Sequence, residues 1–315
     1  MKYLTNRCTR AHWNMAFDEW VLEGLHTPEP VFYLWQNAPA VIIGLNQSPY
    51  AEVNLPYLEE HGIVLARRVT GGGAVYHDLG NLNYSIVGPL EQMERAFEWV
   101  PAALNRLGVK AERSGRNDIL VEGRKCSGYA KRMSKDRIMI HGTLMWDVDL
   151  TALTEALKVP GSKVSAKGIA SVRSRVANLR DYLPQYPSLE AFRQALQDIL
   201  ANGDGELLLT PEQLAAVDAA HKDKFGTWEW NFGHSPQTTH HAQKKFPCGT
   251  VEVLYSLKGG VLTEVEFQGD FLGNRPASEL GRAILGKQPR QLAAMDVSAY
   301  FDGLDGPALA SLFQA

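Results

Sequence analysis

The sequence has few cysteines, no excess of either charge and no long apolar run, and each absence narrows the class of protein. Three cysteines in 315 residues (Cys8, Cys126 and Cys248) are too few and too scattered for a disulfide framework or a zinc site. Lys and Arg number 32 against 35 Asp and Glu, a formal net charge of −3. A chain that is basic throughout, as many nucleic-acid-binding proteins are, is therefore excluded, and an anion site must come from local clusters.

Membrane and export signals are also lacking. The longest uncharged stretch, 30–51, contains Gln36, Asn37, Asn46 and Gln47, which are each unfavourable in lipid. The N-terminal residues reach a second charge before any apolar run begins, so we expect no signal peptide. These observations predict a reduced, soluble, cytoplasmic protein with neither a membrane nor a nucleic acid as partner.

Length and composition predict two globular domains. The polar run 234–241 is typical of a linker, and two alternating strands follow it at 250–257 and 261–267, with two helical patterns after them. We therefore expect a first domain over 1–242 and a small α+β domain over 246–315.

The first domain alternates strand and helix patterns. Trp13, Phe17 and Val21 recur at helical spacing, with Asn14 available as the N-cap, and a short helix is expected from Pro56. The expected strands are 31–35, 41–45, 64–69, 74–77, 82–87, 119–121, 125–131 and 138–146, the last three forming an antiparallel meander. The other expected helices are 91–107, divided or kinked at Pro101, and 150–158, 188–201 and 211–223.

The strongest local signal for chemistry is a triple glycine, Gly71 to Gly73, that follows two arginines. Without Cβ atoms, successive backbone N–H groups can converge on an anion, and Arg67 and Arg68 offer charged donors for phosphate or carboxylate. The segment is neither a Walker A loop nor a dinucleotide-binding fingerprint, because the residues that those motifs require are missing.

Two basic segments lie in the same domain. Residues 110–137 carry nine Lys or Arg against four Asp or Glu, and residues 163–180 carry five cations and no acid. Together with the paired arginines, they indicate a polyanionic ligand such as a nucleotide.

Cys126 could be a nucleophile, with Lys125 beside it and His77 and His141 elsewhere in the chain. If 125–131 is a strand, however, adjacent side chains point to opposite faces, so Lys125 and Cys126 cannot both line one pocket. We expect Cys126 to be a small buried hydrophobic residue.

The ordered set of motifs resembles lipoate–protein ligase A over about residues 10–233. The matching segments, in chain order, are 67–78 with Gly80-Asn81, Gly115-Arg116-Asn117-Asp118-Ile119, Gly123-Arg124-Lys125 with Ser127-Gly128, His141-Gly142-Thr143-Leu144, 167–179 and Trp230-Asn231-Phe232-Gly233. Each motif alone is weak, but the ordered set is highly specific.

The resemblance implies an α+β fold of the biotin/lipoyl protein ligase type with mixed sheets, followed by a small α+β accessory domain. It implies that lipoate and Mg²⁺-ATP react to lipoyl-AMP and pyrophosphate, and that the lipoyl group then passes to a lysine of an acceptor. The acceptors would be lipoyl domains, in the E2 subunits of 2-oxoacid dehydrogenases and the glycine cleavage H protein. No tightly bound prosthetic group is implied.

The resemblance also implies roles for individual residues. Lys125 matches the lysine that contacts the lipoate carboxyl group and the α-phosphate, and would be the catalytic residue. The residues implied to bind ATP or lipoate are Arg68, Thr70, Gly73, Ala74, Val75, Tyr76, His77, Asp118, Lys125 and His141. Asp118 is also implied as a Mg²⁺ contact. The segment 163–176 matches a loop that folds over the adenylate, with Lys167, Gly168, Ser171, Val172 and Arg173 as its implied contacts.

Two alternatives remain open at the level of sequence. An ATP-independent octanoyltransferase of the same fold would need a cysteine that faces the pocket. The alternation of side chains along the strand disfavours Cys126 in that role. A non-catalytic subunit that binds lipoate or a nucleotide would not need Lys125. A biotin ligase is disfavoured because its Gly-Arg-Gly-Arg loop is absent.

Overall fold

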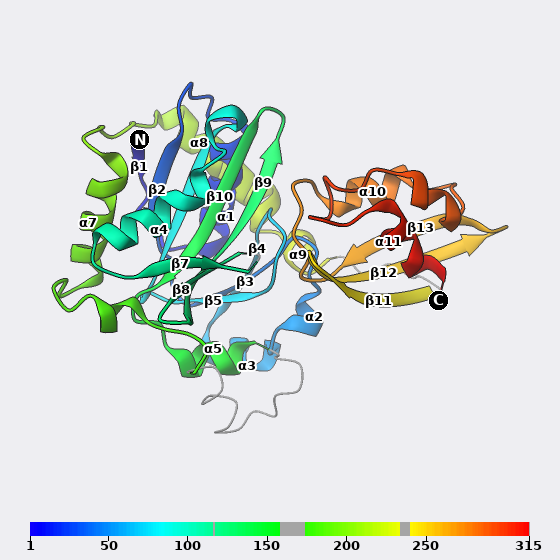
Figure 1. Ribbon diagram of the computed structural model, residues 1–315, viewed down its shortest axis with the longest axis horizontal. Coiled ribbons are helices and arrows are strands. Elements are labelled where there is room, and N and C mark those ends of the chain that lie inside the picture. The colour runs from blue at the N-terminus through cyan, green and yellow to red at the C-terminus, as the bar shows by residue number, and fades with distance from the viewer. Residues whose placement is uncertain (116, 158–173, 234–239, 315) are drawn as a thin grey trace.

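The structure, a computed structural model, describes residues 1–115, 117–157, 174–233 and 240–314. Figure 1 shows a larger body formed by the N-terminal part of the chain and a smaller body formed by the C-terminal part. No helix in the described ranges is long and apolar enough to cross a membrane.

A seven-stranded mixed sheet is the frame of the larger body, with strand order β1-β2-β6-β10-β9-β8-β7. The strands are β1 (Lys2–Thr5), β2 (Val31–Trp35), β6 (Asn81–Pro89), β7 (Ala111–Ser114), β8 (Asp118–Val121), β9 (Arg124–Ser134) and β10 (Arg137–Met145). The first two pair in parallel, and the other neighbouring pairs of this sheet are antiparallel. The predicted antiparallel meander, β8-β9-β10, is therefore confirmed.

A smaller sheet, β4-β3-β5, shares a hydrophobic core with one face of the large sheet. Its strands are β3 (Ala40–Ile43), β4 (Val64–Arg67) and β5 (Val75–His77). Because side chains alternate between the faces of a strand, Ile42 packs inward toward the first helix while Val41 and Ile43 pack outward.

Helices complete the layers on either side of the two sheets. They are α1 (Ala11–Glu23), α2 (Pro49–Glu52), α3 (Leu55–His61), α4 (Ala96–Arg106), α5 (Leu150–Ala156), α7 (Leu189–Ala201), α8 (Pro211–Ala220) and α9 (Trp228–Asn231). Shorter turns of helix lie at Leu90–Gln92, Leu179–Tyr182 and His221–Phe225. One core joins α4 and α7 to the rear of the large sheet, and a second joins α1 and α8 to its front. The space between the two sheets is thus bounded by α1.

The expected N-cap of α1 is wrong. The helix begins at Ala11, and Asn14 lies buried within its first turns. The two hydrogens of Asn14 Nδ2 are instead shared among Cys8 O, Gln36 O and Asn37 Oδ1, and these acceptors outside the helix hold the side chain away from the helix end.

The smaller body contains three strands where the sequence predicted two. They are β11 (His240–Phe246), β12 (Gly249–Lys258) and β13 (Val261–Gln268), and α10 (Ala277–Ala283), α11 (Gly306–Ala310) and helical turns at Pro289–Ala294 and Ser311–Gln314 complete it. His240 and His241, expected in a linker, belong to β11. This edge strand has mostly exposed polar side chains and so lacks the apolar alternation that marks a strand. We propose that the domain boundary lies before His240 rather than between 242 and 246.

The smaller body touches the triple glycine directly. Gly72 N donates to Phe271 O at 3.0 Å, and Lys131 Nζ lies 3.2 Å from Asp302 Oδ2. Two further backbone bonds join the bodies, Gly269 N to Asn46 O and Met133 N to Asn274 O.

Candidate active site

A pocket opens between the two sheets and beside α1. It contains about 630 Å³ of empty space, part of it open to solvent. Its lining comes from both sheets, the triple glycine and α1: Met15, Trp35, Ile42, Arg68, Gly72, Gly73, Ala74, Val75, His77, Asn83, Asn117, Lys125, Gly128, Tyr129, Ala130, His141, Gly142 and Thr143. The pocket therefore brings together segments that are more than one hundred residues apart in the sequence.

The strand register defines the long axis of the pocket. Trp35 pairs with Asn83, Asn83 pairs with Thr143, and Gly128 N donates to Thr143 Oγ1 at 3.3 Å. Neighbouring strands are about 4.8 Å apart, so this row runs about 14 Å across four strands, from β9 to β2.

The two ends of this row differ in burial. A Cβ on Gly128 would lie 3.1 Å from Lys125 Nζ, which places the lysine at the β9 end, and its side chain is 40% exposed. At the other end, Asn83 and Trp35 are 1% and 3% exposed. The pocket thus has an open, cationic mouth and a closed, buried end.

A β-bulge aims Lys125 into the pocket. Ile119 pairs with Ser127 but Leu120 pairs with Lys125, so Cys126 is the extra residue on β9. Strict alternation from Gly128 would have placed Cys126 in the pocket and Lys125 behind it. The prediction that the two side chains face opposite ways is confirmed, and the bulge decides which of them faces the pocket.

Cys126 lies in the core behind the large sheet. Its side chain is fully buried, and its Sγ contacts Ile119 O at 3.4 Å. Burial raises the pKa of the Cys126 thiol to about 12, although Lys125 favours the thiolate. A thiol in this environment is protonated at neutral pH and is a poor nucleophile.

Lys125 is held at the mouth by its side chain and its backbone. Its Nζ lies 2.7 Å from Asp118 Oδ1. Its N–H donates to Arg175 O, and its carbonyl accepts from Ala177 N, both at 2.8 Å. The segment that ends the expected adenylate loop is therefore bonded to the backbone of the lysine itself.

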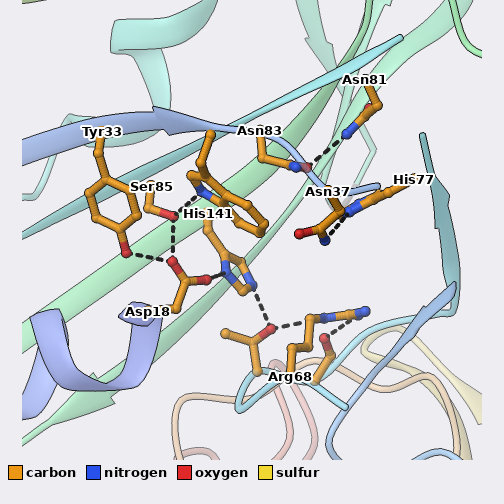
Figure 2. Close-up of polar contacts among 12 residues, drawn as sticks. Asp18, Tyr33, Asn37, Arg68, His77, Asn81, Asn83, Ser85 and His141 are labelled. Atoms are coloured by element: carbon orange, nitrogen blue, oxygen red, sulfur yellow. Dashed lines mark hydrogen bonds and ion pairs between the residues drawn. The ribbon is translucent and has the colours of Figure 1, made fainter. Parts of the chain in front are cut away.

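Asp18 is the centre of a buried polar network that the sequence did not reveal (Figure 2). Its carboxylate accepts from Tyr33 Oη at 2.5 Å, from Ser85 Oγ at 2.8 Å and from His141 Nδ1 at 2.6 Å. His141 Nε2 lies 2.8 Å from Thr70 Oγ1. Asp18 thus fixes the orientation of the His141 ring and, through it, the residue that precedes the triple glycine.

Arg68 connects this network to the triple glycine through its hydrogen bonds. It is 7% exposed, and it donates to Thr70 Oγ1 and to the carbonyl oxygens of Ile42, Gly71 and Gly73 at 2.7–3.1 Å. Burial lowers the pKa of Arg68 to about 10, so the guanidinium stays charged at neutral pH. Three of its five N–H donors thus shape the loop, and a fourth holds the guanidinium against β3.

Arg67 does not line the pocket, contrary to the expected pair of anion-binding arginines. Its guanidinium is buried and donates to five backbone carbonyl groups, those of Gly44, Leu45, Gln47, Trp230 and Asn231. Neighbouring residues of a strand point to opposite sides, so only one of the two arginines can reach the pocket.

His77 lies at the closed end with its ring 6.2 Å from that of Trp35. Its Nδ1 accepts from Asn37 Nδ2 at 3.1 Å. Burial, and then the charges of Arg68 and His141, lower the pKa of His77 to about 3, so the ring is neutral. Its Nε2 then carries the hydrogen and has no hydrogen-bond partner in the described part of the chain.

The other expected site residues are placed as follows. Gly73, Ala74 and Val75 line the pocket, whereas Tyr76 is buried in the core on the outer face of the small sheet. Lys167, Gly168, Ser171, Val172 and Arg173 lie outside the described residues. Within the described ranges, no group of three or more His, Cys, Asp or Glu side chains could hold a metal ion.

Asp18, Trp35 and Asn83 were not predicted from the sequence as site residues, and Thr143 was recognised only as part of a matching segment. A signal for one of them was present, because polar residues alternate along the expected strand 82–87 and its N-terminal neighbour: Asn81, Asn83 and Ser85. Polar side chains at period two in an otherwise apolar strand indicate a polar surface inside the fold.

A pocket with a cation at its open end and a buried far end suits an elongated ligand with an anionic group at one end, and it makes this pocket the candidate active site. Comparisons with known proteins narrow the class of enzyme. The model of the lipoyl protein ligase A/B catalytic domain matches residues 10–201, and that of the bacterial lipoate protein ligase C-terminus matches residues 235–313.

Individual relatives agree. The chain is 38% identical to lipoate-protein ligase LplJ of Bacillus subtilis, over 90% of this chain and 89% of that protein. A structure of the bipartite lipoate protein ligase of Thermoplasma acidophilum, described with its E2 lipoyl domain, matches with a TM-score of 0.67 and 30% identity, over 76% of this chain and 98% of that chain. A crystal structure of lipoate-protein ligase A bound with ATP matches with a TM-score of 0.64 and 30% identity, over 74% and 98%.

The chain belongs to the lipoate–protein ligase family. The expected fold, with mixed sheets and a C-terminal domain that has its own sheet, is confirmed, and so is the expected class of enzyme, a ligase.

Proposed function

We propose that the enzyme joins lipoate to a lysine of lipoyl domains in two steps at the mouth of the pocket, with ATP as the activating substrate. The observation that carries the proposal is the polarity of the pocket, with Lys125 at the open end and a buried end about 14 Å away. A lipoate molecule would lie along this row with its carboxylate at Lys125.

In the first step, a carboxylate oxygen of lipoate attacks the α-phosphorus of ATP, and the bond to the β-phosphate breaks. Pyrophosphate leaves and lipoyl-AMP remains. Negative charge grows on the oxygens around phosphorus, and Lys125 is the cation that stabilises it. The Asp118 carboxylate, 2.7 Å from Nζ, holds the ammonium in place until the phosphate arrives.

Mg²⁺ would accompany the phosphates. Mg²⁺ in nucleotide sites is commonly held by one or two carboxylates and the substrate phosphates, and the half-exposed Asp118 fits that arrangement. The ion would offset the charge of the leaving pyrophosphate, while Lys125 remains next to the reacting carboxyl group.

The triple glycine would bind lipoyl-AMP through its backbone. Arg68 draws the carbonyl groups of Gly71 and Gly73 to itself, and Gly72 N already donates to Phe271 O, so the N–H of Gly73, which lines the pocket, would be the one to face a ligand. Thr70, Ala74 and Val75 would act as part of the same wall. The basic segment 163–176, with Lys167, Gly168, Ser171, Val172 and Arg173, would fold over the adenylate, because Arg175 is already bonded to the backbone of Lys125.

In the second step, the amine of the acceptor lysine attacks the acyl carbon, and AMP leaves with the bonding electrons on its phosphate oxygen. The amine loses its proton to solvent. Lys125 would then stabilise the oxyanion on the acyl carbon, so that one cation serves both steps. The open mouth would admit a lysine from the lipoyl domain of an E2 subunit or of the glycine cleavage H protein in the cytoplasm.

The cysteine-dependent octanoyltransferase is disfavoured by the burial of Cys126 and by the protonated state of its thiol. An ATP-dependence test separates the two activities. Purified enzyme, lipoate and a lipoyl domain should give a domain that is heavier by one lipoyl group only when ATP is added. Modification without ATP from an octanoyl carrier protein would reject the proposal.

A further inference from the structure

Two buried N–H groups at the closed end of the pocket have no hydrogen-bond partner in the described ranges. They are His77 Nε2 and Asn83 Nδ2. Both residues line the pocket, and they are 3% and 1% exposed. Buried donors are nearly always paired, so two unpaired ones in one pocket indicate a ligand that supplies acceptors there.

Neighbouring side chains fix the direction of both donors (Figure 2). Asn14 Nδ2 donates to Asn37 Oδ1 at 2.8 Å. This leaves Asn37 Nδ2 to donate to His77 Nδ1, the contact that Figure 2 shows. The His77 hydrogen must therefore be on Nε2. Asn81 Nδ2 likewise donates to Asn83 Oδ1 at 2.8 Å, which leaves Asn83 Nδ2 as the unpaired donor.

The donors lie at the depth that the tail of an eight-carbon acid would reach. Asn83 is on β6, two strands from Gly128 on β9, a separation of about 9.6 Å. An extended chain advances about 1.2 Å per bond. In an acid whose carboxyl group is bound at Lys125, the eighth carbon therefore lies about 9 Å from the carboxyl carbon. The ring of Trp35 closes the pocket just beyond, 6.2 Å from that of His77.

We infer that His77 and Asn83 select the substrate by its tail, favouring the dithiolane ring of lipoate over the methyl end of octanoate. This inference rests on the proposed function. The dithiolane sulfurs carry lone pairs and are weak acceptors, whereas the end of octanoate has none. A methyl group at this depth would exclude water from both donors and satisfy neither, and a site built to hydrogen-bond a substrate disfavours the analogue that lacks the partner.

The test measures pyrophosphate release from ATP, with lipoate or octanoate and without an acceptor. The wild-type kcat/KM should be about tenfold higher for lipoate than for octanoate. His77→Phe and Asn83→Leu, which remove one donor each, should lower that ratio severalfold. His77→Gln is the matched control. Its amide can accept from Asn37 and donate into the pocket, so its ratio should stay within about twofold of wild type.

Equal kcat/KM for the two acids in the wild-type enzyme would overturn the inference, and so would an unchanged ratio in both His77→Phe and Asn83→Leu. If neither substitution gives a folded protein, calorimetric titration of the wild-type enzyme with each acid decides, because equal affinities would also overturn it. Pyrophosphate release with lipoate at an unchanged ratio would reject the selectivity and leave the proposed function in place. No release with either acid would reject the proposed function itself.

Discussion

Burial of a neutral His77 makes the stability of the larger body depend on pH in a predictable way. The pKa of His77 is lowered from 6.5 to about 3 in the folded protein, first by burial and then by Arg68 and His141. Between these two values the unfolded chain binds a proton that the folded protein does not bind. The free energy of unfolding must therefore fall as the pH falls below about 6.5.

The magnitude follows from the two pKa values. At pH 5 the unfolded histidine is about 1.5 pH units below its pKa, while the folded one is still neutral. At about 1.36 kcal/mol per unit, His77 alone removes about 2 kcal/mol of stability between pH 7 and pH 5. The loss is large enough to measure against a stability of about 5–15 kcal/mol for a typical domain.

The comparison is between the wild-type protein and His77→Gln, which does not titrate. All seven tryptophans lie before residue 234, so urea unfolding followed by tryptophan fluorescence reports on the larger body. The wild-type protein should lose about 2 kcal/mol more than His77→Gln between pH 7 and pH 5. Every other titrating group is common to the two proteins, which isolates His77. Parallel stability profiles would show that His77 has the same pKa in the folded and unfolded protein, and would refute its burial as a ring that stays neutral at pH 5.

Three further predictions concern other parts of the site. Cys126→Ala should leave ATP-dependent lipoylation of a lipoyl domain unchanged. It should lower the free energy of unfolding by about 1 kcal/mol, because it removes one buried sulfur atom. Loss of lipoylation in a folded variant would show that the thiol takes part in the reaction. Asp18→Asn replaces one of the two carboxylate oxygens by an NH₂ group, so the side chain can no longer accept from His141 on one side and from Tyr33 and Ser85 on the other. Adenylation should then fall on the order of tenfold to a hundredfold, and a normal rate of pyrophosphate release would contradict the orienting role of Asp18. A chain ending at residue 239 lacks Phe271, whose carbonyl group accepts from Gly72 N. We expect this variant to transfer the acyl group from supplied lipoyl-AMP but to adenylate lipoate poorly. Full adenylation by this variant would argue against a role of the smaller body in that step.

Much of the site could be predicted because its chemistry is concentrated in short segments. The triple glycine stands out in the sequence itself, and the family resemblance implied roles for His77, Lys125 and His141. The structure brings these three residues together with Gly72 and Gly73 in one pocket. The local rule of alternation also predicted that Lys125 and Cys126 face opposite ways.

Other features depend on long-range pairing, which no local pattern reveals. The bulge that turns Lys125 toward the pocket exists only in the register between β8 and β9. Asp18 looks like an ordinary polar residue of an amphipathic helix until α1 packs on the large sheet beside His141. Asn14 was likewise predicted to be an N-cap because the sequence does not show its actual hydrogen-bond partners, which lie outside the helix.

Edge strands were the other source of error. Lys2–Thr5, Ala111–Ser114 and His240–Phe246 each lie at the edge of a sheet, where one side of the backbone has no neighbouring strand among the residues that the structure describes. Short or polar strands of this kind carry weak patterns, because fewer of their side chains must be buried.

The central claim is that Lys125, and not a cysteine, activates lipoate at this pocket with ATP. The most direct test is lipoate-dependent pyrophosphate release by the purified protein without any acceptor, for wild type, Lys125→Ala and Cys126→Ala. The account predicts a burst near one equivalent per enzyme for wild type and Cys126→Ala, and none for a folded Lys125→Ala. An undiminished burst from Lys125→Ala, or no burst from the wild-type enzyme, would contradict it.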